Sequence, residues 1–142
     1  MPFSGPAEDR LAIRELLETY ADAVTRRDAA AWGATWAEDG IWSMPDYPEF
    51  PTQHGRTGIV AMWIEAMKQY PGIMFEAWPG SIEVDGDAAR VRSYTSEIYD
   101  QDGLTKRDRG VYDDTCVRIG GQWLFQSRSF SNIHRQHAPK GC

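Results

Sequence analysis

Four long strand-like segments fill the second half of the chain and limit the folds that it can adopt. Short turns separate these segments, namely Asp85-Gly86-Asp87, Gln101-Asp102-Gly103 and Gly120-Gly121. Asp-Gly and Gly-Gly pairs favour the tight turns of β-hairpins, so successive strands are expected to pair antiparallel. The expected strands cover residues 73–84, 88–100, 104–119 and 122–134.

The first half of the chain predicts helices instead. Residues 7–27 form an amphipathic pattern in which apolar side chains recur on one helical face. That face consists of Ile13, Leu16, Leu17, Tyr20 and Val24. Helices that precede a run of hairpin strands are typical of the α+β class and not of alternating βαβ units.

Further elements are expected between the long helix and the sheet. Asp28 is placed to cap a short second helix that runs to residue 37. Trp32 and Trp36 are expected to stack four residues apart on this helix, and Gly40 to end it. The elements that follow are a short strand (41–44), a proline-rich loop (45–53) and a third helix (57–70).

The chain is expected to form one domain over residues 1–142, with a core from about 7 to 135 and short flexible ends, because no repeat or linker interrupts it. A sheet of long antiparallel strands twists and curves. Helices packed on its concave side cannot fill all of the enclosed space. The predicted shape is therefore a cone with a pocket at its open end.

Composition and charge argue against several classes of function. A net charge of −6 argues against a nucleic-acid surface, which needs a basic patch. No long uncharged apolar run or signal-peptide pattern is present, so neither a membrane span nor export is expected. Cys116 and Cys142 are too few for a disulfide framework, and a reduced cytoplasmic setting is expected. Three scattered histidines give no metal-ligand spacing, so no metal is expected.

Several short motifs occur in an order that resembles the nuclear transport factor 2-like superfamily and, within it, the SnoaL-like polyketide cyclase group. They are Ala12-Ile13-Arg14 with Leu16, Leu17 and Tyr20; Arg27-Asp28; Trp36-Ala37-Glu38-Asp39-Gly40; His54-Gly55-Arg56 with Ile59; Ile82-Glu83-Val84-Asp85-Gly86-Asp87; and Gly121-Gln122-Trp123 with Phe125 and Arg128.

The resemblance implies a cone-shaped fold of three N-terminal helices on a strongly curved, mostly antiparallel sheet, commonly a homodimer through the sheet. Relatives of this kind include ketosteroid isomerases, scytalone dehydratase, a haloalkane dehydrochlorinase and polyketide cyclases. Many other members only bind a ligand. None of these chemistries needs a metal or an organic cofactor, so no cofactor is expected here.

The residues of the catalytic pair of the dehydratase-like relatives are missing from this sequence. Those relatives use an Asp on the first helix and a His at the start of the strand after the third helix, which together remove a proton from carbon. The corresponding positions here are Thr25 and Phe75. The sequence therefore argues against a His–Asp dehydratase. Asp22 does not replace the missing acid, because it lies on the polar face of the helix.

The ketosteroid isomerase pattern is matched only in part. Its oxyanion-binding tyrosine corresponds to Tyr20, whereas the position of its catalytic aspartate is occupied by Met44. Tyr20 lies on the apolar face of the first helix, where a buried hydroxyl needs a partner. Two interpretations stay open for Tyr20: a hydrogen-bond donor to a ligand, or a core tyrosine bonded to a neighbouring side chain.

Three further residues could take part in proton transfer. His54 in the His-Gly-Arg motif is either a base at the mouth of the pocket or a residue that shapes the loop and the helix start. Asp114 is expected to share one strand face with Tyr112, and is either an acid in the pocket or the ion-pair partner of Arg128 on the next strand. Glu97 carries the same two alternatives.

The other pocket candidates are apolar or aromatic. The candidate ligand-binding residues are Trp36, Met44, Trp63, Met67, Phe75, Trp78, Tyr112 and Phe130. Together they describe an apolar pocket for an apolar, polycyclic or aromatic small molecule. A cofactor-independent isomerase, dehydratase or cyclase with Tyr20, His54 or Asp114 as catalytic residues, a non-catalytic binding protein, and a small structural subunit remain as alternatives.

Overall fold

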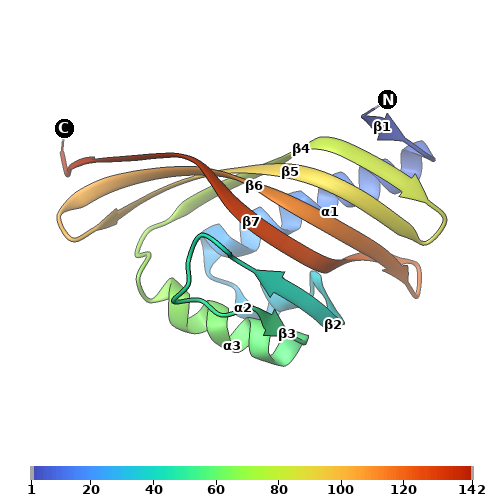
Figure 1. Ribbon diagram of the computed structural model, residues 1–142, viewed down its shortest axis with the longest axis horizontal. Coiled ribbons are helices and arrows are strands. Elements are labelled where there is room, and N and C mark those ends of the chain that lie inside the picture. Colours follow the sequence, from blue (N-terminus) through green and yellow to red (C-terminus); the bar gives the residue numbers. More distant parts are fainter. Residues whose placement is uncertain (1, 142) are drawn as a thin grey trace.

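The computed structural model describes residues 2–141 and shows an α+β fold in which three helices lie on one side of a curved sheet (Figure 1). The helices are α1 (Ala7–Arg26), α2 (Ala29–Gly33) and α3 (Arg56–Met67). The expected class and the cone-like arrangement are therefore confirmed. Within the described residues, no helix is long and apolar enough to cross a membrane.

The sheet has the strand order β1-β4-β5-β6-β7-β2-β3 in the described part of the chain. The strands are β1 (Phe3–Ser4), β2 (Trp36–Ser43), β3 (Gln53–His54), β4 (Met74–Asp85), β5 (Ala88–Gln101), β6 (Leu104–Ile119) and β7 (Gln122–Pro139). The four long strands β4 to β7 pair antiparallel through hairpins, as predicted. Two short strands, β1 and β3, have no periodic sequence signal because each covers only two residues.

The segment after α1 differs from its prediction. Asp28 caps α2, since its Oδ1 accepts a hydrogen bond from the Ala31 amide at 3.0 Å, but the helix ends at Gly33. Trp36 begins β2 and pairs with Phe125 of β7, and Gly40 lies within β2. The ladder with β7 prevails over helix propensity here because it places the Trp36 indole in the core. The rings of Trp32 and Trp36 meet edge to face, 5.9 Å apart.

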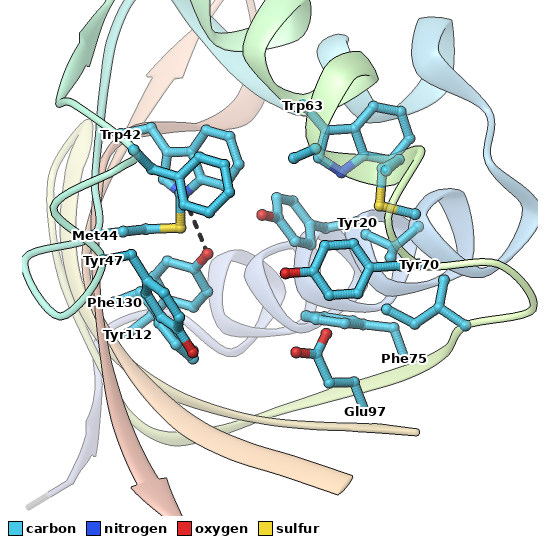
Figure 2. A pocket seen from close by; sticks show the side chains of 15 residues that line it. Tyr20, Trp42, Met44, Tyr47, Trp63, Tyr70, Phe75, Glu97, Tyr112 and Phe130 are labelled. Atoms are coloured by element: carbon cyan, nitrogen blue, oxygen red, sulfur yellow. Dashed lines mark hydrogen bonds between the residues drawn. The ribbon is translucent and has the colours of Figure 1, made fainter. Parts of the chain in front are cut away.

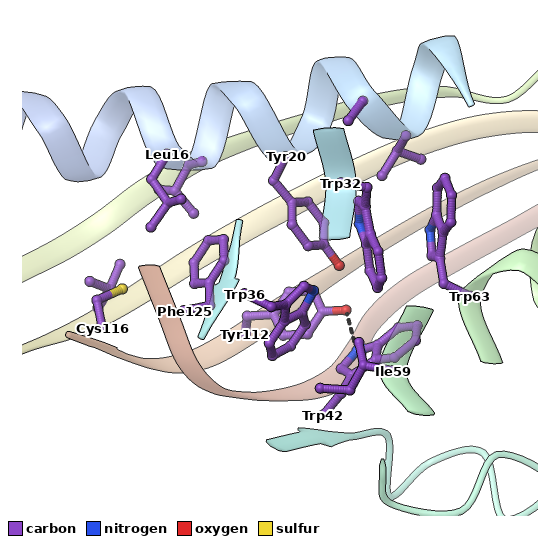
Figure 3. Packing of buried hydrophobic residues seen from close by; sticks show 14 of the residues in the cluster. Leu16, Tyr20, Trp32, Trp36, Trp42, Ile59, Trp63, Tyr112, Cys116 and Phe125 are labelled. Carbon is purple, nitrogen blue, oxygen red and sulfur yellow. Dashed lines mark hydrogen bonds between the residues drawn. The ribbon is translucent and has the colours of Figure 1, made fainter. Parts of the chain in front are cut away.

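The core lies between the concave face of the sheet and the helices and is built from large rings (Figure 3). Trp32, Trp36 and Phe125 are fully buried, and Trp32 stacks on Trp63 of α3 with ring centroids 4.6 Å apart. Aromatic pairs of this kind add about 0.5–1.5 kcal/mol beyond the burial of their area. The rings thus fix α2 and α3 against the sheet, and the Trp63 ring also lines a cavity between α3 and the sheet.

Candidate functional site

A cavity of about 100 Å³ opens between the C-terminal half of α1, α3, the loop after β2 and the concave face of the sheet (Figure 2). Its lining is mostly aromatic and aliphatic. The lining residues are Tyr20, Val24, Trp42, Met44, Tyr47, Phe50, Trp63, Ala66, Met67, Tyr70, Ile73, Phe75, Glu97, Tyr112 and Phe130. Apolar walls with a few polar groups are typical of small-molecule sites.

Regular secondary structure positions the floor of the cavity. Tyr20 and Val24 lie one helical turn apart on α1, so both face the sheet. Phe75, Glu97 and Tyr112 occupy inward positions of β4, β5 and β6, where alternate side chains point to the same face.

The remaining wall comes from segments without periodic structure. The Tyr47 hydroxyl donates to Oδ1 of Asn132 on β7 at 3.0 Å, which holds the loop after β2 over the cavity. Arg27 donates to the carbonyl oxygens of Met67, at 2.8 Å, and Tyr70. These bonds fix the chain after α3, so the ring of Tyr70 reaches the cavity.

Polar groups converge from several elements. In Figure 2 the hydroxyls of Tyr20, Tyr70 and Tyr112 and the carboxyl of Glu97 point toward the same central space. Trp42 Nε1 donates to the Tyr112 hydroxyl at 3.1 Å. Burial raises the pKa of Tyr20 and of Tyr112 above the ordinary value for tyrosine, although Arg128 opposes the shift at both residues. Both hydroxyls therefore stay protonated at neutral pH and can donate hydrogen bonds to a ligand.

Glu97 is the carboxyl group in the cavity lining, and its environment disfavours its charge. Burial raises its pKa to about 8, and the negative charge of Asp108 contributes, whereas Arg135 opposes the shift. Glu97 and Asp108 are directly opposite each other on β5 and β6. At neutral pH the Glu97 carboxyl is therefore mostly protonated, within reach of a ligand.

The Asp108 carboxylate, unlike that of Glu97, has hydrogen-bond and ion-pair partners in neighbouring side chains. The Tyr99 hydroxyl donates to Asp108 Oδ2 at 2.7 Å, and Arg135 Nε lies 3.4 Å from Oδ1. His137 Nε2 lies 3.3 Å from the same oxygen. Two neighbouring carboxyl groups thus have different surroundings: Asp108 is hydrogen-bonded and ion-paired, whereas no protein hydrogen bond within residues 2–141 involves the Glu97 carboxyl.

A buried ion pair lies behind the cavity floor. Arg128 Nε donates to Asp114 Oδ1 at 2.7 Å, and both side chains are fully buried. Ser93 Oγ donates to Asp114 Oδ2 at 2.8 Å and accepts from Arg128 Nη2 at 3.0 Å. The guanidinium carbon lies 3.7 Å from the ring centroid of Tyr112 and 4.4 Å from that of Tyr20. Although burial alone lowers the pKa of Arg128, Asp114 raises it above its ordinary value.

The structure brings most of the predicted pocket residues together. Those that line the cavity are Tyr20, Met44, Trp63, Met67, Phe75, Tyr112 and Phe130. Tyr20, one of the three catalytic candidates, shares the cavity with Glu97, which the sequence left ambiguous.

Two predicted ligand-binding residues lie outside the cavity. Trp36 is fully buried in the core. Trp78 is 45% exposed on the outer face of β4. It lies three residues after the inward-facing Phe75, and the alternation of side chains along a strand places two such residues on opposite faces.

The other two catalytic candidates also lie outside the cavity. Asp114 faces inward but forms a buried ion pair with Arg128, so of its two predicted roles the structure shows the ion-pair partner. His54 is exposed on β3. The adjacent Gly55 amide donates to the Gly40 carbonyl at 2.7 Å, and Arg56 Nε donates to the Trp36 carbonyl at 2.9 Å. The His-Gly-Arg motif thus ties the start of α3 to β2.

The two positions aligned with the catalytic pair of the dehydratase-like relatives are neighbours in space. Thr25 Oγ1 accepts a hydrogen bond from the Phe75 amide at 3.0 Å, and the Phe75 ring lines the cavity. Neither side chain titrates near neutral pH, so this pair cannot remove a proton from a ligand. No group of three or more potential metal-ligating side chains gathers within the described residues.

A substitution in the cavity wall tests how tightly the wall is packed. Gly110 of β6 lies under Phe130, and a Cβ atom there would be 2.2 Å from two ring carbons and 2.9 Å from the Ser131 carbonyl oxygen. We expect Gly110→Ala to displace this ring and lower the free energy of unfolding by about 1–3 kcal/mol, as overpacking does. Urea unfolding measures the change. Gly58→Ala on α3, whose Cβ would meet a flexible side chain, is the control and should cost little.

Comparison with known proteins identifies the family of this chain. Residues 6–129 match the sequence profile of the SnoaL-like domain. The chain belongs to the SnoaL-like domain family. No curated protein matches it.

Solved structures share the SnoaL-like fold over almost the whole chain. A putative scytalone dehydratase from Novosphingobium aromaticivorans DSM 12444 is 22% identical, with 95% of each chain covered and a TM-score of 0.81. A hexachlorocyclohexane dehydrochlorinase from Novosphingobium barchaimii LL02 is 16% identical, with 95% and 92% covered and a TM-score of 0.81. An NTF2-like protein with a cystatin-like fold from N. aromaticivorans is 26% identical, with 89% and 82% covered and a TM-score of 0.74.

Proposed function

We propose that this SnoaL-like protein binds a compact, largely apolar molecule in the cavity between α1, α3 and the sheet. The observation that carries the proposal is the lining, which combines aromatic rings with tyrosine hydroxyls and one carboxyl group. Such a lining removes apolar ligand surface from water, at about 25 cal/mol per Å², and offers hydrogen bonds that orient the ligand.

The size of the cavity narrows the ligand class. A volume of about 100 Å³ is smaller than the cavity of roughly 150 Å³ that holds one benzene molecule in an engineered protein. A ligand of about one ring therefore fits better than the polycyclic molecule that the sequence left open. The flexible side chains of Met44 and Met67 in the wall allow a modest increase in this volume.

Methionine methyl groups provide a direct test of this proposal. Met44 and Met67 line the cavity, whereas Met74 is 59% exposed on the outer face of β4. On titration with phenol, toluene or cyclohexanone, we expect the methyl NMR signals of Met44 and Met67 to shift and that of Met74 to stay in place. An absence of shifts for all of these probes, or equal shifts at Met74, would contradict a ligand site in the cavity.

A second candidate function is cofactor-independent proton transfer, as in an isomerase or lyase. The observation that favours it is that Tyr20 and Glu97 line the same cavity. The Glu97 carboxylate would take a proton from the carbon next to a ligand carbonyl, while the Tyr20 hydroxyl donates to the developing enolate oxygen. Enzyme-dependent exchange of deuterium into a bound cyclic ketone, lost in Glu97→Gln, distinguishes this function from binding alone.

The homodimer that the family resemblance implies stays a prediction. Analytical ultracentrifugation, which measures the mass of the particle in solution, tests it.

A further inference from the structure

The Glu97 end of the cavity combines a carboxyl group with the surfaces of several aromatic rings. Glu97 extends from β5 toward Tyr70 and Phe75, and Trp63 lies across the cavity from it (Figure 2). We propose that the ligand carries a compact organic cation, an ammonium or quaternary ammonium group, held by Glu97 and these three rings. This inference rests on the proposed function and adds the charge of the ligand to it.

Aromatic rings attract cations through the negative potential over their faces. The attraction acts within about 6 Å of a ring centroid and is strongest when water is excluded. Arg128 already occupies one face of Tyr112 and of Tyr20, so these two rings are less suited to a second cation. Trp63, Tyr70 and Phe75 have no such arginine over them within the described residues. Among the lining rings without an arginine over them, Tyr70 and Phe75 lie beside the Glu97 carboxyl in Figure 2, so they are the rings best placed to hold a cation together with it.

The charges around Glu97 leave room for one more positive charge. The groups that face this end of the cavity are Asp108 of β6, Arg135 and His137 of β7, and the hydroxyls of Tyr47, Tyr70 and Tyr99. Arg135 and His137 both lie against Asp108 Oδ1. Glu97 and Asp108 together carry two potential negative charges, whereas Arg135, the permanent cation of this group, lies against Asp108. An ionised Glu97 is thus without a counter-charge of its own.

The raised pKa of Glu97 agrees with the lack of a counter-charge beside its carboxylate. Burial and the charge of Asp108 raise its pKa to about 8, because the carboxylate is poorly compensated. A cation bound beside it would supply the compensation and lower that pKa. A neutral ligand of the same shape would not. Cation binding should therefore release a proton at neutral pH, whereas binding of a neutral molecule should not.

The test uses two molecules of the same shape that differ in charge, choline and 3,3-dimethylbutan-1-ol. At pH 9, where Glu97 is ionised, we expect calorimetry to show choline binding at least tenfold more tightly than the neutral alcohol. Binding of choline should be about tenfold weaker at pH 7 than at pH 9, because the proton on Glu97 must leave first. Glu97→Gln should remove both the preference for choline and its pH dependence. Glu76→Gln, on the outer face of β4, should change neither.

Two results would overturn the inference. One is equal or tighter binding of the alcohol to the wild-type protein, and the other is unchanged choline affinity in Glu97→Gln. If phenol or toluene shifts the methyl signals of Met44 and Met67 but choline does not bind, only the charge of the ligand is wrong. If no probe binds, the proposed function fails together with this inference.

Discussion

Replacing Asp114 with asparagine is expected to lower the free energy of unfolding by about 3–5 kcal/mol, the usual cost of removing one partner from a buried ion pair. The substitution keeps the shape of the side chain but removes the charge that compensates Arg128. The guanidinium lies among the rings of Tyr20, Tyr112 and Phe125 and cannot reach water. One of its nitrogens, Nη1, already has no hydrogen-bond partner within the described residues. The remaining charge would therefore be buried and uncompensated.

Chemical denaturation measured by far-UV circular dichroism gives the size of this effect. Asp113→Asn is the matched control, because Asp113 is exposed on the other face of β6, and it should change stability by less than about 0.5 kcal/mol. A second control combines Asp114→Leu with Arg128→Met, which removes both charges and should recover at least half of the loss. A loss below 1 kcal/mol in Asp114→Asn would show that the ion pair does not carry the stability assigned to it.

Replacing Glu97 with glutamine is expected to stabilise the protein at pH 8 by about 2 kcal/mol. The pKa of Glu97 is raised from its ordinary 4.5 to about 8 in the folded state. Between these values the unfolded chain loses a proton that the folded chain keeps, so wild-type stability falls as the pH rises. A shift of this size corresponds to at most about 5 kcal/mol, and the partial exposure of Glu97 reduces the effect through solvent screening.

The difference between the variant and the wild type isolates Glu97 from other titrating groups. It should be close to zero at pH 4, grow between pH 4.5 and 8, and stay constant above that. Glu76→Gln should show no such dependence, since this residue is exposed on the outer face of β4. Stability that is equal for Glu97→Gln and the wild type at pH 8 would mean that the folded protein tolerates the Glu97 charge, and the electrostatic description of the cavity would be wrong.

Much of the fold could be predicted because the sequence patterns that specify its helices, strands and turns are local and periodic. The apolar face of the first helix and the glycine turns between β4 and β7 specify those elements to within a few residues at most of their ends. The start of β2 could not be found in this way. Trp36 pairs with Phe125, which lies far away in the sequence, and that pairing prevails over a pattern that suits a helix equally well.

The candidate site could be predicted only in part, for a similar reason. Pocket residues on α1 and on the strands can be identified from their spacing in the sequence. Strict alternation of side chains from Phe75 along β4 excludes Trp78 from the pocket. The same rule places Glu97 on the inward face of β5 with Thr95 and Tyr99, which are both buried. Tyr47 and Phe50 lie in a proline-rich loop without any period, so the sequence pattern does not indicate that they line the cavity. The folded structure places them there, where the Tyr47 hydroxyl donates to Asn132.

Ser93, Asp114 and Arg128 come from three successive strands, β5, β6 and β7, and they meet inside the protein. A shift of any one strand by a single residue would turn its member of this group outward and leave a partner without compensation. A shift by two residues would keep the apolar side chains inward but would still separate these three polar groups. The cluster therefore favours one alignment of the sheet over its neighbours, and this is the alignment that places Glu97 opposite Asp108.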